Sequence, residues 1–584
     1  MRAAFRFRLR LVLAFLILIG VFIFVRLYFI QVVQGNDYAE KADRQYMSSG
    51  SGLFDRGSIY FTRKDGTLIS AASLASGFLV AINPQTLQDA EGAYEAISAI
   101  ALGSVDRETF LKAAGNENAV YVEVAHHLTD EQGKALSANK SLKGVQVFRE
   151  RWRMYPGATL ASQTLGVVAR QSGDTLLAGR TGLEKKYEDV LSRSGEGLYK
   201  NFFAELFADL GNALGDARSA QTGDVLTTIE PEVQTRLLKD LLAIEAKYAS
   251  RETGGIIMDP STGAIIALGT IPTYDANAFQ EADQSLLGNP LVGHVYEFGS
   301  IMKPLTMAAA LDVGVVTPHT TYNDTGCTTL DTSTICNFDL KARGTVPMQQ
   351  ILSQSLNLGA AFLALRLGPS TLRSYFTSLG FGEKTGIDLP AEASGLIKNL
   401  NSPRQIEYAT AAFGQGIAIT PVEMIRALGA LANGGALVDP HVVRAIELDS
   451  GLVKPLDWTP DPTRQVFKGE TVRQVSEMLT LVVDKALASG AVRIPTMSVA
   501  AKTGTSELTK PGGGYYDDRF FHSFFGYFPS YAPRFIILLY TNDPRGVQYA
   551  SETLTSTFMD LTHFLIDYYD IPPDRGVATS TPSL

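Results

Sequence analysis

Residues Tyr296–Leu311 read YEFGSIMKPLTMAAAL, and from residue 298 onward the only charged side chain in this stretch is Lys303. Removing an ammonium group from water costs several kcal/mol unless other contacts offset that cost. Pro304 suits the first turn of a helix, where its missing N–H is tolerated. Ser300 lies three residues before Lys303 and therefore on the same helical face. We expect the apolar setting to lower the pKa of Lys303, so that its neutral amine activates the Ser300 hydroxyl as a nucleophile.

The S-x-x-K spacing alone is weak evidence, because residues 137–140 (SANK) repeat it in a polar stretch. A second motif, Ser355-Leu356-Asn357, lies downstream in ILSQSLNLGAAFLA. The Ser355 hydroxyl is suited to relaying protons, and the Asn357 amide to holding either a substrate carbonyl or the lysine. Taken alone, this motif is explained equally well as a serine and an asparagine that lie on the surface at a helix end and have no catalytic role.

The third motif is KTGT, which begins at Lys502. A copy of K-T-G at residues 384–386 has no strand-like run before it, whereas the copy at 502 follows SVAA and precedes HSFFGYFP and RFIILLYTN. The second copy therefore predicts an edge strand. The small Gly504 would let a peptide lie alongside that strand and hydrogen-bond to its backbone.

The side chains of this third motif predict the recognition of an anionic group. Lys502 supplies positive charge, and the hydroxyls of Thr503 and Thr505 are suited to binding a carboxylate. The backbone N–H groups of Thr505 and Ser300 are expected to form an oxyanion hole. The candidate catalytic residues are thus Ser300, Lys303, Ser355, Asn357 and Lys502, and the candidate substrate-binding residues are Thr503, Gly504 and Thr505.

The pattern along the 584 residues predicts two large parts. Residues 34–221 are mixed, with a hairpin turn at 64–66 between short strands and amphipathic helices around 87–102 and 106–114, and we interpret them as a non-enzymatic pedestal. Residues 222–569 have strands near both ends, helices between them and a final helix at 558–569. They predict one α+β domain whose sheet joins its first and last strands. Residues 570–584, rich in Pro, Ser and Thr, predict a disordered tail.

The N-terminus predicts a membrane anchor. Four arginines occur within residues 1–10, and the apolar stretch of 11–33 is long enough for one transmembrane helix if Arg26 extends to the far interface. The arginines place residues 1–10 in the cytoplasm and the remaining domains outside it. A cleaved signal peptide is the alternative, but no small-x-small cleavage site follows the apolar core.

Charge and cysteine content narrow the class of protein. A net charge of -9 argues against nucleic acid as the main partner. The seven histidines are scattered without metal-ligand spacing, so no metal site is expected. Cys327 and Cys336 lie in the polar segment TGCTTLDTSTICNF and suggest a loop-closing disulfide without a catalytic role, with two unpaired thiols as the alternative.

The three motifs together resemble those of serine penicillin-binding proteins and related β-lactamases. The fuller stretches YEFGSIMKP, SQSLNLG, FGQGIAITPVEM, LANGG, KTGT and SFFGYFP are similar to class B penicillin-binding proteins, the monofunctional peptidoglycan transpeptidases. Upstream, RGSIY, RMYPGATLASQTLG and TGLEKKYEDVL resemble the pedestal of that class, a dimerisation-type domain. The resemblance implies an α+β penicillin-binding-protein/β-lactamase-like transpeptidase domain with a central antiparallel sheet, preceded by an elongated mixed α/β pedestal and one transmembrane helix.

The mechanism that the resemblance implies is acyl transfer. Ser300 would attack the D-Ala–D-Ala carbonyl of a peptidoglycan stem peptide, with Lys303 as the base, and an amine of a second stem peptide would take the acyl group. Ser355 and Lys502 would pass protons to the leaving amine, and Asn357 would orient the donor. β-Lactams would acylate Ser300, and no metal or organic cofactor would be required.

Several functional alternatives remain open at the level of sequence. The compact pedestal and the absence of C-terminal repeat modules look like the division-type, FtsI-like group, which acts in septal wall synthesis. An elongation-type enzyme that maintains cell shape is the runner-up. A β-lactamase, a β-lactam-sensing receptor and a catalytically silent scaffold are weaker alternatives. By family, the partners would be a polytopic glycosyltransferase and divisome proteins at the bacterial cytoplasmic membrane.

Overall fold

The computed structural model describes residues 55–101, 105–170, 177–193, 222–459, 461 and 463–576, together with residue 19. Most of the predicted anchor (1–10 and 11–33), the junction at 221 and residues 577–584 lie outside these ranges. Within the part of the chain that the structure describes, no helix has both the length and the apolar character that a transmembrane span requires.

Two compact units make up the protein, and they do not follow chain order. The larger unit combines Gly57–Ser73, Arg153–Arg193 and Asp216–Leu584. The smaller unit contains Leu74–Trp152 together with residues 1–56 and 194–215. Segments 57–73 and 153–193, which precede the predicted boundary near residue 222, therefore pack with the residues that follow it.

The smaller unit is built on the second half of strand β2 (Leu68–Ile82), which pairs with β3 (Val122–Leu128) and β4 (Val145–Met154). Helices α3 (Ala90–Ile100) and α4 (Arg107–Ala114) occupy the two predicted helical segments, and each begins after an aspartate that caps its first turn. Helix α5 (Asp130–Ala138) follows β3. Their apolar faces share one core, which includes Val80, Ile97, Phe110 and Leu136.

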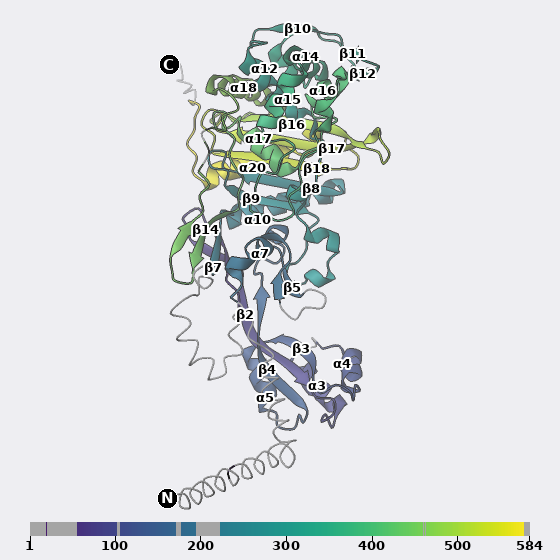
Figure 1. Ribbon diagram of the computed structural model, residues 1–584, viewed down its shortest axis with the longest axis vertical. Coiled ribbons are helices and arrows are strands. Elements are labelled where there is room, and N and C mark those ends of the chain that lie inside the picture. The colour runs from purple at the N-terminus through teal and green to yellow at the C-terminus, as the bar shows by residue number, and fades with distance from the viewer. Residues whose placement is uncertain are drawn as a thin grey trace, which may run out of the picture. The chain divides into compact units, whose positions relative to one another are not determined.

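The larger unit is organised around a five-stranded antiparallel sheet with the strand order β16-β17-β18-β8-β9. Its strands are β8 (Glu252–Met258), β9 (Ile265–Ile271), β16 (Ala500–Thr509), β17 (Tyr515–Phe528) and β18 (Phe535–Asn542). Strand β8 pairs with β18, so the first strands of the domain join the last ones, as the sequence predicts. In Figure 1 these strands lie between α10 and the helices α12, α14, α15, α16 and α18.

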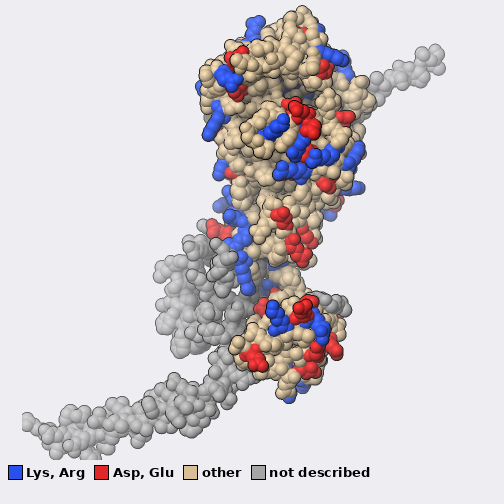
Figure 2. Space-filling model, turned by 90° about the vertical axis from the view of Figure 1, so that its right-hand side faces the viewer, with Lys and Arg blue, Asp and Glu red and all other residues tan. Residues whose placement is uncertain are grey.

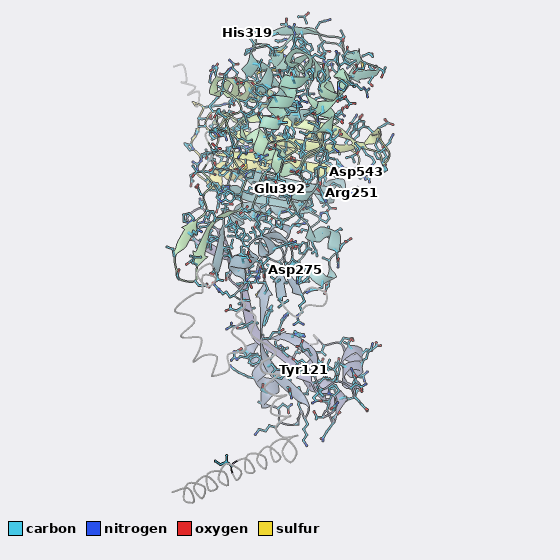
Figure 3. The ribbon with its side chains drawn as sticks, in the orientation of Figure 1. Tyr121, Arg251, Asp275, His319, Glu392 and Asp543 are labelled. Carbon is cyan, nitrogen blue, oxygen red and sulfur yellow. A yellow bond between two sulfur atoms is a disulfide. The ribbon has the colours of Figure 1, made fainter. Side chains whose placement is uncertain are left out.

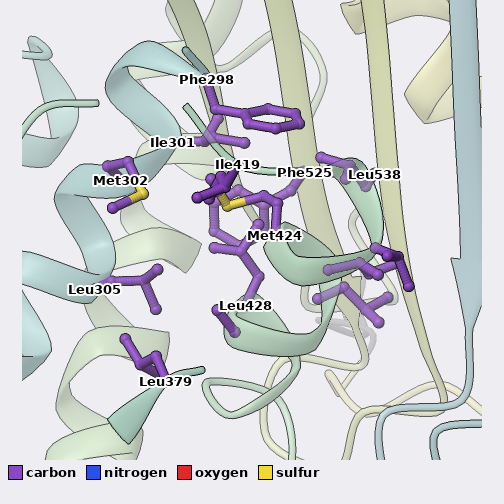
Figure 4. Packing of buried hydrophobic residues seen from close by; sticks show 14 of the residues in the cluster. Phe298, Ile301, Met302, Leu305, Leu379, Ile419, Met424, Leu428, Phe525 and Leu538 are labelled. Carbon is purple, nitrogen blue, oxygen red and sulfur yellow. The ribbon is translucent and has the colours of Figure 1, made fainter. Parts of the chain in front are cut away.

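Both faces of this sheet are buried. Helices α10 (Pro231–Tyr248) and α20 (Thr555–Tyr568) cover one face, where Leu237 and Phe558 share a core with Phe524. On the other face, apolar residues of the segment 298–305 pack against Met424 of α17 (Pro421–Gly429) and Leu538 of β18, as Figure 4 shows. Segment 298–305 belongs to the stretch that opened the sequence analysis, and the sheet therefore fixes its position.

A second sheet of the larger unit has the order β15-β14-β7-β1-β2, in which β1 and β7 are parallel and the other pairs antiparallel. Its strands are β1 (Ile59–Thr62), β7 (Gly223–Thr227), β14 (Val443–Leu448), β15 (Val453–Pro455) and the start of β2. The predicted turn at 64–66 does join β1 to β2, with Gly66 at a positive φ of 86°. The sequence analysis predicted short strands on both sides of this turn. That prediction is wrong for β2, which is 15 residues long and continues into the smaller unit.

The remaining elements of the larger unit are short strands and helices. Three two-stranded ladders pair β5 (Val168–Arg170) with β6 (Leu177–Gly179), β10 (Thr321–Asp324) with β13 (Gly344–Pro347), and β11 (Cys327–Leu330) with β12 (Ser333–Cys336). The helices are α6 (Ser162–Leu165), α7 (Gly182–Lys186), α8 (Glu188–Leu191), η3 (Phe279–Glu281), η4 (Gln284–Leu287), α11 (Pro290–Gly293), η5 (Gly299–Met302), α12 (Lys303–Val313), α13 (Met348–Ser353), α14 (Asn357–Leu367), α15 (Pro369–Ser378), η6 (Lys398–Asn401), α16 (Gln405–Ala411), α18 (Gly469–Leu481), η7 (Val482–Ala486), η8 (Leu487–Gly490) and α19 (Ala550–Thr553).

The chain stays packed beyond residue 570, where the sequence analysis starts the disordered tail. Ile571 is buried, Asp574 accepts a hydrogen bond from the Ser498 backbone N–H at 2.7 Å, and Arg575 forms an ion pair with Asp484 at 2.8 Å. The packed chain therefore reaches at least residue 575.

Charged side chains of both signs share the surface of the larger unit. On the face that Figure 2 shows, Lys and Arg side chains lie among Asp and Glu side chains.

Candidate active site

Ser300 lies on a tight helical turn that leads directly into a longer helix. It is part of the 3-10 helix η5, and Lys303 is the first residue of α12. In a 3-10 turn, residues three apart stand one above the other, so both side chains leave the backbone on the same side. Pro304 occupies the first turn of α12, as expected. Ser300 is half-buried, whereas Lys303 is 0 % exposed.

The turn that carries Ser300 is fixed by contacts with the neighbouring strands and loop. Gly299 adopts a positive φ of 63°, and its N–H donates to the Gly414 carbonyl at 3.2 Å. The Ser523 hydroxyl of β17 donates to the Phe298 carbonyl at 2.7 Å. A Cβ atom at Gly299 would lie 2.6 Å from the Thr505 carbonyl oxygen, so only glycine fits there.

The Lys303 amine contacts two residues of the second motif. Its Nζ lies 2.6 Å from the Ser355 carbonyl oxygen, 2.8 Å from Asn357 Oδ1 and 3.2 Å from Ser355 Oγ. Burial and, to a lesser degree, the charge of Lys502 hold the pKa of Lys303 well below its ordinary value. The amine of Lys303 therefore becomes neutral at a lower pH than that of an exposed lysine.

Ser355 adopts an unusual backbone conformation in the connection between α13 and α14. Its φ is 54°, a left-handed conformation that costs a non-glycine residue on the order of 1 kcal/mol and is often found at functional sites. This conformation places its hydroxyl between two lysines, 3.2 Å from the Nζ of Lys303 and 3.0 Å from that of Lys502. The hydroxyl can therefore pass a proton from one amine to the other.

Lys502 lies on β16, at the edge of the five-stranded sheet, and is 2 % exposed. Its Nζ also donates to the Thr503 carbonyl at 2.8 Å. Burial lowers the pKa of Lys502 to about 7. Among the described residues, no carboxylate forms an ion pair with Lys303 or Lys502.

The residues after Lys502 divide between the two faces of β16. A Cβ atom at Gly504 would lie 2.3 Å from Ser523 Oγ and 2.6 Å from the Phe298 carbonyl oxygen. The glycine is therefore required by the close approach of η5, whereas the sequence reasoning assigned its space to a peptide. Thr503 and Thr505 alternate to the opposite face and are half-buried, and Thr505 Oγ1 accepts a hydrogen bond from the Ala550 N–H at 3.1 Å.

The structure thus joins Lys303, Ser355, Asn357 and Lys502 in one hydrogen-bonded cluster. Across the described residues, the Ser300 hydroxyl makes no hydrogen bond with a protein group, although the sequence analysis expected the Lys303 amine to activate it. Catalytic hydrogen bonds commonly tighten only when substrate is bound.

The duplicate motifs lie elsewhere. Ser137 of the SANK copy belongs to α5 in the smaller unit, where its hydroxyl donates to the Gly133 carbonyl at 2.8 Å. Thr385 of the second K-T-G copy donates its N–H and its hydroxyl to Glu392, each at 2.6 Å. Figure 3 labels Glu392 within the larger unit. Both copies therefore serve local structure.

Two features beside the site were missed or left open. Burial raises the pKa of the Glu297 carboxyl, two residues before Gly299, to about 7, and this carboxyl accepts a hydrogen bond from the Tyr515 hydroxyl at 3.0 Å. In the sequence, only its position next to an apolar run could have pointed to Glu297.

Cys327 and Cys336 form a disulfide, and the Cys336 carbonyl accepts a hydrogen bond from Asn357 Nδ2 at 3.0 Å.

Solved structures of similar fold are penicillin-binding proteins. The model matches penicillin-binding protein 2X from Streptococcus thermophilus with a TM-score of 0.70 and 19% identity, over 89% of this chain and 81% of that one. It also matches penicillin-binding protein 3 from Mycobacterium tuberculosis in complex with aztreonam, with a TM-score of 0.66 and 21% identity, over 89% of this chain and 97% of the other. At these identities, the likeness concerns the fold.

Sequence relatives agree with this fold. The chain is 28% identical to stage V sporulation protein D of Bacillus subtilis, over 91% of this chain and 81% of the relative. It is 27% identical to the probable peptidoglycan D,D-transpeptidase FtsI of Caulobacter vibrioides, over 83% of this chain and 75% of the relative. Residues 55–199 match the penicillin-binding protein dimerisation domain, and residues 253–562 match the penicillin-binding protein transpeptidase domain. Since the latter match covers more than half of the chain, the protein belongs to the penicillin-binding protein transpeptidase family.

Proposed function

We propose that this protein is a peptidoglycan D,D-transpeptidase that cross-links stem peptides through an acyl-enzyme on Ser300. The observation that carries the proposal is the buried amine of Lys303, which follows Ser300 on the same helical face and contacts both Ser355 and Asn357. Relatives named peptidoglycan D,D-transpeptidase support the activity.

In the first half-reaction, the Ser300 oxygen forms a bond to the carbonyl carbon of the penultimate D-Ala, and the bond to the terminal D-Ala nitrogen breaks. Lys303 takes the hydroxyl proton of Ser300. Ser355 lies between the two lysines and returns a proton to the leaving amine, with Lys502 as the second member of the relay. In the second half-reaction, an amine of a neighbouring stem peptide attacks the ester and releases Ser300.

Substrate binding relies on the edge strand β16. The free backbone edge of this strand is suited to pairing with an extended donor peptide. The hydroxyls of Thr503 and Thr505 bind the donor carboxylate, and Lys502, whose side chain lies on the opposite face of β16, contributes positive charge at longer range. The N–H groups of Ser300 and Thr505 bind the oxyanion. Gly504 supports this arrangement by admitting η5 close to the strand.

The cellular role rests on the resemblance to the FtsI-like group. We place the enzyme in septal wall synthesis, held at the cytoplasmic membrane by residues 11–33, with a polytopic glycosyltransferase and divisome proteins as partners. An elongation-type role is the alternative. A fluorescent fusion concentrated at midcell supports the septal role, and a fusion distributed along the sidewall supports the alternative.

Covalent labelling with a fluorescent penicillin tests the activity. The wild-type chain should retain one label per molecule, and Ser300→Ala should retain none while it melts at the same temperature. Rapid release of the label would indicate a β-lactamase, and failure of the wild-type chain to take the label would indicate a silent scaffold.

A further inference from the structure

We infer that the disulfide-bridged hairpin β11–β12 positions the amide of Asn357, so that its oxygen always faces Lys303. The contact that does this is the hydrogen bond from Asn357 Nδ2 to the Cys336 carbonyl, 3.0 Å long. Cys336 is in this view a positioning residue that acts through Asn357. The inference rests on the proposed function, because it concerns the base that activates Ser300.

The chemistry of the amide makes this orientation unique. A carbonyl oxygen can only accept hydrogen bonds, so the Cys336 carbonyl requires the NH₂ group of Asn357 on its side. The amide oxygen then faces the Lys303 amine, which lies 2.8 Å away. A reversed amide would place its oxygen against the Cys336 carbonyl oxygen and its NH₂ group against the amine.

The orientation decides what the Lys303 amine can do. A neutral amine has two N–H groups and one lone pair. The Ser355 carbonyl at 2.6 Å and Asn357 Oδ1 at 2.8 Å accept its two N–H groups, which leaves the lone pair for a hydroxyl proton, with the Ser355 hydroxyl 3.2 Å from the nitrogen. A reversed Asn357 amide would donate to that lone pair and occupy the base.

The position of the Cys336 carbonyl is fixed by contacts of Cys336 itself and of the next residue, Asn337. Cys327 lies directly opposite Cys336 in the ladder and is bonded to it. The following residue, Asn337, donates its N–H to the Gly326 carbonyl at 2.8 Å, and its side-chain oxygen accepts from the Leu358 N–H at 3.2 Å. The start of α14 is therefore tied to the hairpin at two adjacent residues.

The disulfide adds a covalent bond to a hairpin that is otherwise held by the buried side chain of Ile335 and by the hydrogen bonds of Asn337. Among the described strands, β11 and β12 pair only with each other. Isolated two-stranded hairpins are marginally stable in water. Without the bridge, the carbonyl that orients Asn357 is expected to move.

A double-mutant cycle on the purified full chain tests this inference. The variants are Cys327→Ser with Cys336→Ser, Asn357→Ala, and the combination of all three, and the readout is the second-order rate constant of acylation by a labelled penicillin. We expect a roughly tenfold loss from the paired serines, the size of one oriented hydrogen bond, and no further loss when they are added to Asn357→Ala.

The pH profile separates positioning from general loosening. Loss of an acceptor destabilises the charged form of Lys303, so the acid limb of the acylation rate should move to lower pH in the paired serines, as in Asn357→Ala. Lys502 is the ionisable neighbour whose charge acts on Lys303, and it is unchanged in every variant. A loosened structure would lower the rate without moving this limb.

The hairpin also offers a matched control. Thr329 and Thr334 face each other two residues from the bridge, with their hydroxyl oxygens 3.1 Å apart. Thr329→Ala with Thr334→Ala should leave the acylation rate unchanged. If the paired serines do not fold, wild-type chain reduced after folding gives the same comparison.

Three results would overturn the inference: full acylation without the bridge, an equal loss in the threonine control, or a loss that adds to that of Asn357→Ala. Each of these outcomes still leaves the wild-type chain labelled by penicillin. Absence of labelling in the wild-type chain would instead refute the proposed function.

Discussion

The two faces of the five-stranded sheet are both buried and serve different purposes. On the α10–α20 face, the apolar side chains of Leu237, Phe524 and Phe558 share one core. On the η5–α12 face, similar packing surrounds Lys303 and Lys502, which are buried without a carboxylate partner among the described residues. Burial of apolar side chains therefore contributes stability on both faces. On the second face, burial of the two amines costs stability and lowers their pKa values.

The largest expected effect comes from removing the amine while keeping its volume. Lys303→Met should lower the acylation rate constant about 10³-fold, the usual scale of a lost general base. Its melting temperature should stay equal or rise, because an apolar side chain replaces a buried cation without an ion-pair partner. Acylation assays and calorimetry on the same sample check this, and a large loss of stability would mean that Lys303 is a structural group.

On the α10–α20 face we expect the opposite result, a loss of stability without a loss of acylation rate. Phe558 is fully buried and stacks on Phe524 with ring centroids 4.4 Å apart. Phe558→Ala should destabilise the protein by about 3–5 kcal/mol through the cavity that it leaves. Well below the melting temperature, the acylation rate constant should be unchanged. Denaturant unfolding and penicillin labelling check the two halves, and a specific loss of rate would show that the faces are coupled.

Gly504 provides a further test of the comparison, because it lies on the η5–α12 face of the sheet, beside the candidate catalytic residues. An added Cβ would meet Ser523 Oγ and the Phe298 carbonyl at distances that no real Cβ tolerates. Gly504→Ala should push η5 away and lower the acylation rate constant about 10²-fold, as displacements near 1 Å can do. Gly269 of β9 is the matched control, because its nearest contact would be Gln234 Nε2 at 3.5 Å. Equal rates in the two alanine variants would argue against this account of the site.

The smallest effect concerns the second lysine. Since burial lowers the pKa of Lys502 to about 7, the residue loses its positive charge as the pH rises above that value. Acylation of a carboxylate-bearing substrate should therefore decline above about pH 7, by up to about tenfold per pH unit. Lys502→Arg keeps its charge and should remove this alkaline limb from the pH profile, even if the maximal rate is lower. A limb that persists in the arginine variant belongs to another group.

The spacing within one stretch of sequence predicted local features of the site correctly. Ser300 and Lys303 are three residues apart, and helical geometry alone places them on one side of the chain. The contacts of Lys303 with Ser355 and of Ser355 with Lys502 depend on how distant segments pack, and only the order of their motifs could be read from the sequence. Asn357 was proposed to hold either the substrate or the lysine, and in the structure it contacts the lysine.

Other features could not be predicted because they depend on tertiary contacts. Gly504 was read as space for a peptide, but its Cβ position is filled by the Phe298 carbonyl of a segment 200 residues away, and only the packed structure shows this. The length of β2 and the interleaving of the two units likewise follow from pairing between distant segments. The packing of residues 571–575 was hidden by their polar composition.

The most direct test of the account is the pH dependence of penicillin acylation on the acid side. The account predicts that burial holds the pKa of Lys303 well below its ordinary value, so that the rate falls only when the pH drops through a pKa well below that of an ordinary lysine. Lys303→Met should lack this limb. A wild-type rate that instead keeps rising tenfold per pH unit toward about pH 10, where an ordinary lysine titrates, would contradict the claim that burial makes Lys303 the base.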